Sequence, residues 1–254
     1  MAVQVRDEGP VRVVVLDRPE VRGAVDGEHA AALAEAFEEL EQRDDLAVGV
    51  LTGSQGHFCA GADLRAAVEG RIPLFDPGEG RGPMGPTRLR LSKPVVAAVE
   101  GHAVAGGLEL ALWCDLRVAS ETAVFGVYCR RWGVPLIDGG TVRLARVVGQ
   151  GVAMDMLLTG RAVEAEEALR VGLANRVVPP GEALSAAVAL AQQLAALPQR
   201  CLRQDRLSLL EQWGLPEEEA LANEWRHGRV TLEGGLEEVQ RFLSGAGRHG
   251  EPAG

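Results

Sequence analysis

The sequence contains little of several residue types, and each shortage excludes a class of protein. Only four cysteines occur in its 254 residues, and none is spaced like a Cys-x-x-Cys or Cys/His ligand pair. We therefore expect neither a disulfide framework nor a metal site. There is no long apolar span, no charged leader and no lipidation motif. These absences predict a cytoplasmic protein that does not associate with membranes.

Basic residues and nucleotide motifs are scarce as well. The 26 lysines and arginines are outnumbered by 36 acidic residues, which gives a net charge of -10. Such a surface repels phosphates, so we expect no nucleic-acid partner. No glycine-rich phosphate loop and no Gly-x-Ser-x-Gly elbow is present. The hydrophobic content of 46% is nevertheless enough to bury a full core.

The chain does have an acidic residue in the first turn of an expected apolar helix that begins at two glycines. Residues 101–113 read GHAVAGGLELALW, and Glu109 stands between two leucines. Burying an ionised acid is costly, so an ordinary core helix has no reason to place one there. Gly106 and Gly107 allow close approach, and a helix that begins there presents free N–H groups to an anion. The alternative is a first-turn glutamate that only offsets the helix dipole.

A second glycine turn follows an apolar strand expected over 47–52. Residues 56–64 read GHFCAGADL, in which small residues expose the backbone and Asp63 can accept hydrogen bonds that hold the turn. Alone, this is a tight connection from strand to helix. A further strand, expected over 95–99, leads into the Glu109 segment. Together the two turns predict a pair of backbone N–H donors, as an oxyanion hole for a thioester requires.

These motifs resemble the crotonase (enoyl-CoA hydratase/isomerase) superfamily. The resemblance rests on FCAGADL and on KPVVAAVEGHAVAGGLELALWCD about 30 residues later, with LDRPE before them and LLTGR after them. It extends from about residue 11 to about residue 178 and is more specific for the superfamily than for the reaction. It implies an α/β fold, the crotonase (ClpP-like) spiral of ββα units with a helical C-terminal part.

The resemblance also implies site residues. The two oxyanion N–H groups would belong to Ala62 and Gly106. The residues implied to bind the coenzyme A part are Arg22, Ala24, Ala60, Asp63 and Leu64. Gly23 replaces the asparagine of the family segment, so Arg22 could equally be a solvated surface arginine. No cofactor is implied, because coenzyme A arrives as the thioester substrate.

The catalytic acids depart from the hydratase pattern. Glu109 matches the first catalytic glutamate of the family, but Cys129 occupies the place of the second and is best interpreted as a small buried residue. Asp138 lies where dienoyl-CoA isomerases also carry an acid. It directly precedes Gly139 and Gly140 and a helix expected over 142–148. Asp138 therefore suits an N-cap and a catalyst equally well.

The chemistry leaves three functions open. Two N–H donors on a thioester carbonyl favour an enolate, so the reaction should occur at the adjacent carbons. Hydration needs one group for water and one for the Cα proton, whereas double-bond migration needs only proton removal and return. We expect an enoyl-CoA hydratase, with an enoyl-CoA or dienoyl-CoA isomerase as the alternative. A catalytically silent acyl-CoA-binding homologue is the non-enzyme alternative, because Cys129 removes half of the usual acid pair.

Hydrophobic periodicity and turn residues organise the rest of the chain. We expect strands over 2–6, 11–16 and 115–119, and helices over 27–43, 182–197, 199–213, 216–227 and 231–243. Glycines and prolines over 69–87 predict a mobile loop, either a lid or a plain connection. We divide the chain into a spiral core with the acyl-CoA site (1–198) and a C-terminal helical trimerisation region (199–254). The resemblance to the crotonase superfamily implies a homotrimer or a dimer of trimers, with the C-terminal helices forming the contact.

Overall fold

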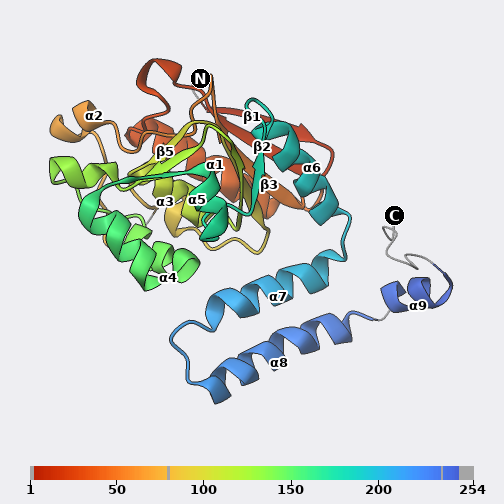
Figure 1. The fold of residues 1–254 in the computed structure, drawn as a ribbon. Helices are drawn as coiled ribbons and strands as arrows, with labels where there is room; N and C mark the ends of the chain where they lie inside the picture. Colours follow the sequence, from red (N-terminus) through yellow and green to blue (C-terminus); the bar gives the residue numbers. More distant parts are fainter. Residues whose placement is uncertain (1–2, 79–80, 236, 246–254) are drawn as a thin grey trace.

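The computed structural model describes residues 3–78, 81–235 and 237–245, which form two sheets with helices around them (Figure 1). The strands are β1 (Val3–Glu8), β2 (Val11–Leu16), β3 (Val48–Gly53), β4 (Val95–Val99), β5 (His102–Val104), β6 (Leu116–Ser120), β7 (Val124–Gly126), β8 (Ala162–Glu164) and β9 (Arg176–Val178). The α-helices are α1 (Gly27–Gln42), α2 (Leu64–Val68), α3 (Gly106–Trp113), α4 (Gly140–Thr159), α5 (Ala165–Arg170), α6 (Ala183–Ala195), α7 (Gln199–Glu211), α8 (Glu217–Glu233) and α9 (Glu237–Leu243). Three short 3-10 helices are η1 (Pro19–Val21), η2 (Pro86–Arg88) and η3 (Tyr128–Trp132).

The larger sheet has the strand order β1-β2-β3-β4-β6-β9, and the smaller sheet has the order β5-β7-β8. β1 is antiparallel to β2, and the other neighbours in the larger sheet are parallel. After β4 the chain turns at Gly101 into β5 and α3, and then returns to the larger sheet as β6. Gly101 has φ +52°, and a Cβ there would overlap the carbonyl oxygen of Gly56. The path repeats strand, strand and helix, which is a spiral.

Side chains that alternate along the central strands bury both faces of the larger sheet. One face packs against α6 and includes Val11, Val13, Val48, Val50, Val96, Ala98 and Val118. The opposite face joins α1, α3 and the smaller sheet in the main core. β3 and β4 are adjacent and parallel, so the glycine turns that follow them leave the sheet at the same edge.

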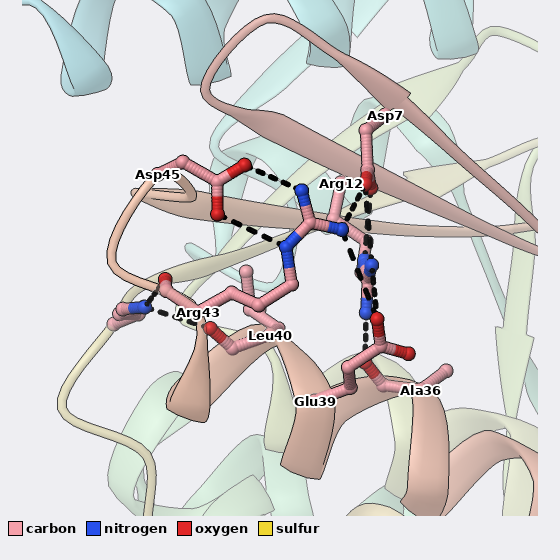
Figure 2. A network of polar contacts seen from close by, with 8 residues as sticks. Asp7, Arg12, Ala36, Glu39, Leu40, Arg43 and Asp45 are labelled. Carbon is pink, nitrogen blue, oxygen red and sulfur yellow. Dashed lines mark hydrogen bonds and ion pairs between the residues drawn. The ribbon is translucent and has the colours of Figure 1, made fainter.

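A polar network fastens the β1-β2 hairpin to the end of α1 (Figure 2). Arg12 is only 2% exposed, and its side chain donates to Asp7, to Glu39 and to the Ala36 carbonyl. The hydrogen bond from Arg12 lowers the pKa of Asp7. Arg43 at the end of α1 also donates to Asp7, at 2.6 Å. The network thus joins side chains that lie up to 36 positions apart in the sequence.

The predicted elements are largely confirmed, apart from a helix break expected after residue 227; Ala2 lies outside the described residues. The end of the helix expected over 142–148 is confirmed, because the backbone of Gly149 is non-helical at φ +78° and breaks α4 there; the helical part from there to Thr159 was not predicted. The break expected after residue 227 is absent, since α8 continues to Glu233. His227 contacts Gln204 and Glu211 of α7, and this packing carries α8 through Gly228.

The interpretation of 69–87 as one mobile loop is wrong for residues 81–87, and residues 79–80 lie outside the described chain. Gly82 and Gly85 exchange two backbone hydrogen bonds in a tight turn. Met84 is 2% exposed and Thr87 is fully buried. A Cβ at Gly85 would overlap the Ala30 carbonyl oxygen. Glycine and proline here allow close packing, not flexibility.

The C-terminal helices α7 and α8 lie side by side, away from the sheets (Figure 1). Arg206 ties α7 to the core by donating to Asp115 at 2.8 Å and to the Leu91 carbonyl at 2.6 Å. Large apolar side chains on this pair remain exposed, among them Leu221 and Trp225 at 57% and 63%. The trimerisation region over 199–254 stays a prediction, and its residues 246–254 lie outside the described chain. No helix within the described ranges is long and apolar enough to cross a membrane.

Candidate active site

A cavity of about 470 Å³ lies where the two glycine turns meet the turn at residues 82–85 and the segment 128–138. Its wall is mostly apolar, and its charged side chains are Arg22, Glu109 and Asp138. Seven of the nine residues predicted from the sequence line it, namely Arg22, Ala60, Ala62, Leu64, Gly106, Glu109 and Asp138. The structure therefore brings together motifs that lie far apart in the sequence.

The backbone N–H groups of Ala62 and Gly106 are available to a ligand. Among the residues that the structure describes, neither group donates a hydrogen bond to a protein acceptor. The two turns touch, since a Cβ built at Gly61 would lie 2.9 Å from the Gly106 nitrogen. Gly61 has φ +100°, a conformation that favours glycine. A β-bridge between Cys59 and Ala103 holds the turns together.

The residue before Gly106 has a strained backbone, which the sequence analysis did not predict. Ala105 has φ +53° and ψ -123°, and it precedes the first residue of α3. Such conformations cost on the order of 1–3 kcal/mol in a residue other than glycine. They gather at sites where geometry matters more than stability. Here the conformation aims the start of α3 at the cavity.

Glu109 is 2% exposed, and its carboxylate bonds to the N-terminus of a different helix from its own. Its Oε1 accepts hydrogen bonds from the Asp138 and Gly140 N–H groups, each at 2.8 Å. Burial raises the pKa of Glu109 to about 7, the charge of Asp138 adds to this, and the two N–H bonds oppose it. Gly140 is required at this contact, because a Cβ there would lie 2.9 Å from the Glu109 carboxylate. At neutral pH Glu109 can both take and return a proton.

The interpretation of Asp138 as an N-cap is wrong. The N-cap of α4 is Gly139, and the side chain that accepts from the first N–H of the helix, that of Gly140, belongs to Glu109. Asp138 is 3% exposed, and its Oδ1 instead accepts from the Met84 N–H at 3.0 Å and from the Thr87 hydroxyl. Burial raises the pKa of Asp138, and these two hydrogen bonds oppose that increase. The carboxylate points to the turn at 82–87 because Glu109 has already taken the helix end.

Cys129 also lines the cavity and is 7% exposed. Burial raises the pKa of its thiol, with a further increase from the charge of Glu109. The thiol is therefore neutral at physiological pH and is not a ready base. This fits the prediction of a small buried side chain where the second catalytic acid would stand. Among the residues that the structure describes, Glu109 and Asp138 are the acids of the cavity wall.

Ala24 and Asp63, the other two predicted residues, do not line the cavity. The Asp63 carboxylate accepts from the N–H groups of Arg65 and Ala66 and begins α2, as its interpretation as a turn holder predicted. Arg18 contacts Asp63 at 3.4 Å and donates to the Ala24 carbonyl at 2.6 Å. Both residues thus help to hold the turns, and their contact with coenzyme A stays a prediction.

Three residues of the site carried no signal in the sequence: Met84, Thr87 and Arg143. Arg143 donates to the Asp138 carbonyl at 2.8 Å and to the Thr87 carbonyl at 2.7 Å. It therefore joins α4 to the turn at 82–87. Arg143 and Thr87 are more than fifty residues apart in the sequence, so no local pattern could reveal their contact.

The chain belongs to the enoyl-CoA hydratase/isomerase family, whose family model matches residues 6–232. It is 37% identical over 225 residues to the enoyl-CoA hydratase EchA19 of Mycobacterium tuberculosis, covering 85% of this chain and 83% of that protein. It is 44% identical over 190 residues to a carnitinyl-CoA dehydratase of Salmonella arizonae, covering 73% of this chain and 71% of that protein.

A solved structure agrees with this assignment. The crystal structure of the enoyl-CoA hydratase EchA1 from Mycobacterium marinum matches with a TM-score of 0.89 at 33% identity, over 95% of this chain and 94% of that one. The predicted α/β crotonase fold with a helical C-terminal part is therefore confirmed. The protein therefore belongs to an enzyme family that includes enoyl-CoA hydratases and isomerases.

Proposed function

We propose that the protein is an acyl-CoA enzyme of the enoyl-CoA hydratase type that binds a thioester with its carbonyl oxygen between the N–H groups of Ala62 and Gly106. The observation that carries the proposal is the convergence of three groups on one apolar cavity. Two are the backbone donors without a protein acceptor among the described residues, and the third is Glu109 with its raised pKa.

The two donors would stabilise the enolate that forms when the thioester accepts a nucleophile or loses a proton. Each N–H would lie about 3 Å from the thioester oxygen, and removal of one such donor costs about 10²–10³ in kcat. The apolar wall excludes water and so strengthens these hydrogen bonds. Because the donors belong to the backbone, they are held in place before the substrate arrives.

Glu109 would supply the proton chemistry of hydration. Its carboxylate takes a proton from water while the water oxygen adds to Cβ of the enoyl thioester. The electrons of the double bond move to the thioester oxygen as an enolate. Glu109 then returns the proton to Cα, so that one water is consumed and the carboxylate is regenerated. A pKa of about 7 suits a group that must do both.

Isomerisation is the second candidate, and Cys129 is the observation that favours it. Double-bond migration needs one group to move a proton between Cα and Cγ, and Glu109 alone can do this. Hydratases of the family pattern have two acids, whereas a neutral thiol stands at the second place here. A catalytically silent acyl-CoA binder remains the non-enzyme alternative.

Assays with two substrates distinguish these functions. Hydration consumes the conjugated double bond of crotonyl-CoA, whereas isomerisation creates one from a 3-enoyl-CoA. We expect Glu109→Gln to lower kcat for the active substrate by about 10²-fold or more while coenzyme A binding changes little. Glu121→Gln is the matched control, because Glu121 is exposed and does not line the cavity. Full activity of Glu109→Gln would contradict the mechanism, and binding without turnover would indicate the silent binder.

We also propose that α7 and α8 form the contacts of a homotrimer or a dimer of trimers. The exposed Leu209, Leu221 and Trp225 on this helix pair support the proposal, at 63%, 57% and 63% exposure. Side chains of this size are seldom left in water as a group. Sedimentation equilibrium at ordinary salt would test it, and a monomeric mass would contradict it.

A further inference from the structure

The turn at residues 82–87 is attached to the catalytic end of the cavity through Asp138. The Asp138 carboxylate accepts from the Met84 N–H at 3.0 Å and from the Thr87 hydroxyl. All three residues are at most 3% exposed. Buried hydrogen bonds to a carboxylate are stronger than neutral ones, and loss of a partner leaves an unsatisfied buried group. The turn is thus held against the start of α4.

The turn places Met84 beside Gly106, the residue that carries one of the proposed oxyanion donors. A Cβ built on Gly106 would lie 2.7 Å from the Met84 sulfur and 3.0 Å from its Cγ. Met84 also lines the cavity and is 2% exposed. The thioether therefore packs against Gly106 on the side where a Cβ would stand.

The same network reaches Glu109. The Asp138 N–H donates to Glu109 at 2.8 Å, and Arg143 bonds to the carbonyls of both Asp138 and Thr87. Asp138 thus connects the part of the cavity wall formed by Met84 with Glu109, the proposed proton-transfer group. The Asp138 Oδ2 has no partner within the described part of the chain. A test must therefore distinguish an acid/base role of the Asp138 carboxylate from a role in holding the turn at 82–87.

We propose that Asp138 is a positioning residue, whose carboxylate holds the turn at 82–87 so that Met84 closes the cavity over Gly106. This inference rests on the proposed function for its effect on turnover. The closure itself does not depend on which reaction occurs. Two experiments therefore separate a failure of this inference from a failure of the proposed function.

The first experiment measures kcat, KM and the pH profile of variants at both ends of the contact. Asp138→Asn keeps an oxygen that accepts from Met84 and Thr87 but cannot carry a proton, whereas Asp138→Ala removes the acceptor. We expect Asp138→Ala to lower kcat at least about 10-fold and Asp138→Asn to restore most of that loss. Thr87→Val should resemble Asp138→Ala, and the matched Thr87→Ser should restore the hydroxyl contact.

If Asp138 transfers a proton, the pattern reverses. Asp138→Asn then loses about 10²-fold or more and removes a limb of the pH profile, while Thr87→Val changes little. That result would overturn the inference and restore Asp138 to the catalytic pair with Glu109.

The second experiment measures how accessible the cavity is to a reagent and does not depend on turnover. Cys129 lines the cavity, so its alkylation by iodoacetamide, followed by peptide mass spectrometry, reports access. We expect alkylation of Cys129 to be several-fold faster in Asp138→Ala and Thr87→Val than in the wild type, Asp138→Asn and Thr87→Ser. Cys114 is the internal control, since it is 2% exposed and lies outside the cavity wall.

An unchanged Cys129 rate in Asp138→Ala and Thr87→Val would overturn the inference, whatever the activity. Faster Cys129 alkylation with a constant Cys114 rate supports it even if none of the thioesters is turned over. In that case the proposed function fails and the positioning role stands. Equal acceleration at both cysteines signals general unfolding and contradicts a local closure.

Discussion

Replacing Glu109 by glutamine should stabilise the protein, and more so as the pH rises. The pKa of Glu109 is about 7 in the folded protein, against 4.5 for an ordinary glutamate. Each unit by which folding shifts the pKa corresponds to about 1.4 kcal/mol of folding free energy. Ionised Glu109 therefore costs the fold about 3 kcal/mol at alkaline pH. Glutamine keeps an oxygen that can accept from the Asp138 and Gly140 N–H groups, so the substitution removes mainly the charge.

The sign follows from linkage. Because folding raises this pKa, the fold binds the proton more tightly than the unfolded chain does. The stability contributed by protonated Glu109 is complete below about pH 4.5 and is lost as the pH rises through about 7. The stability difference between variant and wild type should grow by roughly 2–3 kcal/mol from pH 5 to pH 8.5.

Thermal unfolding at the two pH values checks this expectation. For a chain of this length the change corresponds to about 5–10 °C in the difference between the two Tm values. Protein concentration must be the same throughout, because self-association raises Tm. Glu121→Gln, at an exposed carboxylate, should show no such pH-dependent gain. The same Tm difference at both pH values would refute the argument that Glu109 is buried at a cost.

Further outcomes follow from the packing of glycines and of the C-terminal helices. Gly107→Ala should destabilise the fold by several kcal/mol in denaturant unfolding, because its Cβ would overlap the Cys59 carbonyl oxygen. Gly151→Ala, where nothing lies within 4 Å, should instead stabilise the protein by about 0.5–1 kcal/mol. Gly106→Pro should abolish most activity and weaken the binding of thioester ligands, since proline has no N–H to donate to the thioester oxygen. Trp225→Glu should shift the mass in sedimentation toward the monomer, and an unchanged oligomer would place the subunit contact elsewhere.

Much of the fold could be predicted because its signals are local. Valine-rich strands and an amphipathic helix follow from periodicity that neighbouring residues carry themselves. The two glycine turns were also predictable, since small residues beside an isolated acid are conspicuous in an apolar stretch. Ala62, Gly106 and Glu109 meet at one cavity because β3 and β4 are adjacent and parallel.

The remainder of the site depends on contacts between distant segments. Asp138 has the local sequence of an N-cap, and only the arrival of Glu109 at the start of α4 displaces it from that role. The glycines and prolines at 81–87 have the local sequence of a flexible loop. They pack tightly because the Asp138 carboxylate and the Ala30 backbone lie against them. Composition alone cannot distinguish these outcomes, since the same residues favour both.

The arrangement around Glu109 shows how one carboxylate can serve two proton transfers. Burial alone would keep the acid protonated at neutral pH, and it could then not take a proton from water. The two N–H groups at the start of α4 favour the charged form and offset part of that effect. The result is a pKa of about 7, at which both forms are populated. In the proposed mechanism the segment Asp138-Gly139-Gly140 therefore acts first through its backbone, because it supplies the N–H groups that lower the pKa of Glu109 whether or not the Asp138 carboxylate carries a proton.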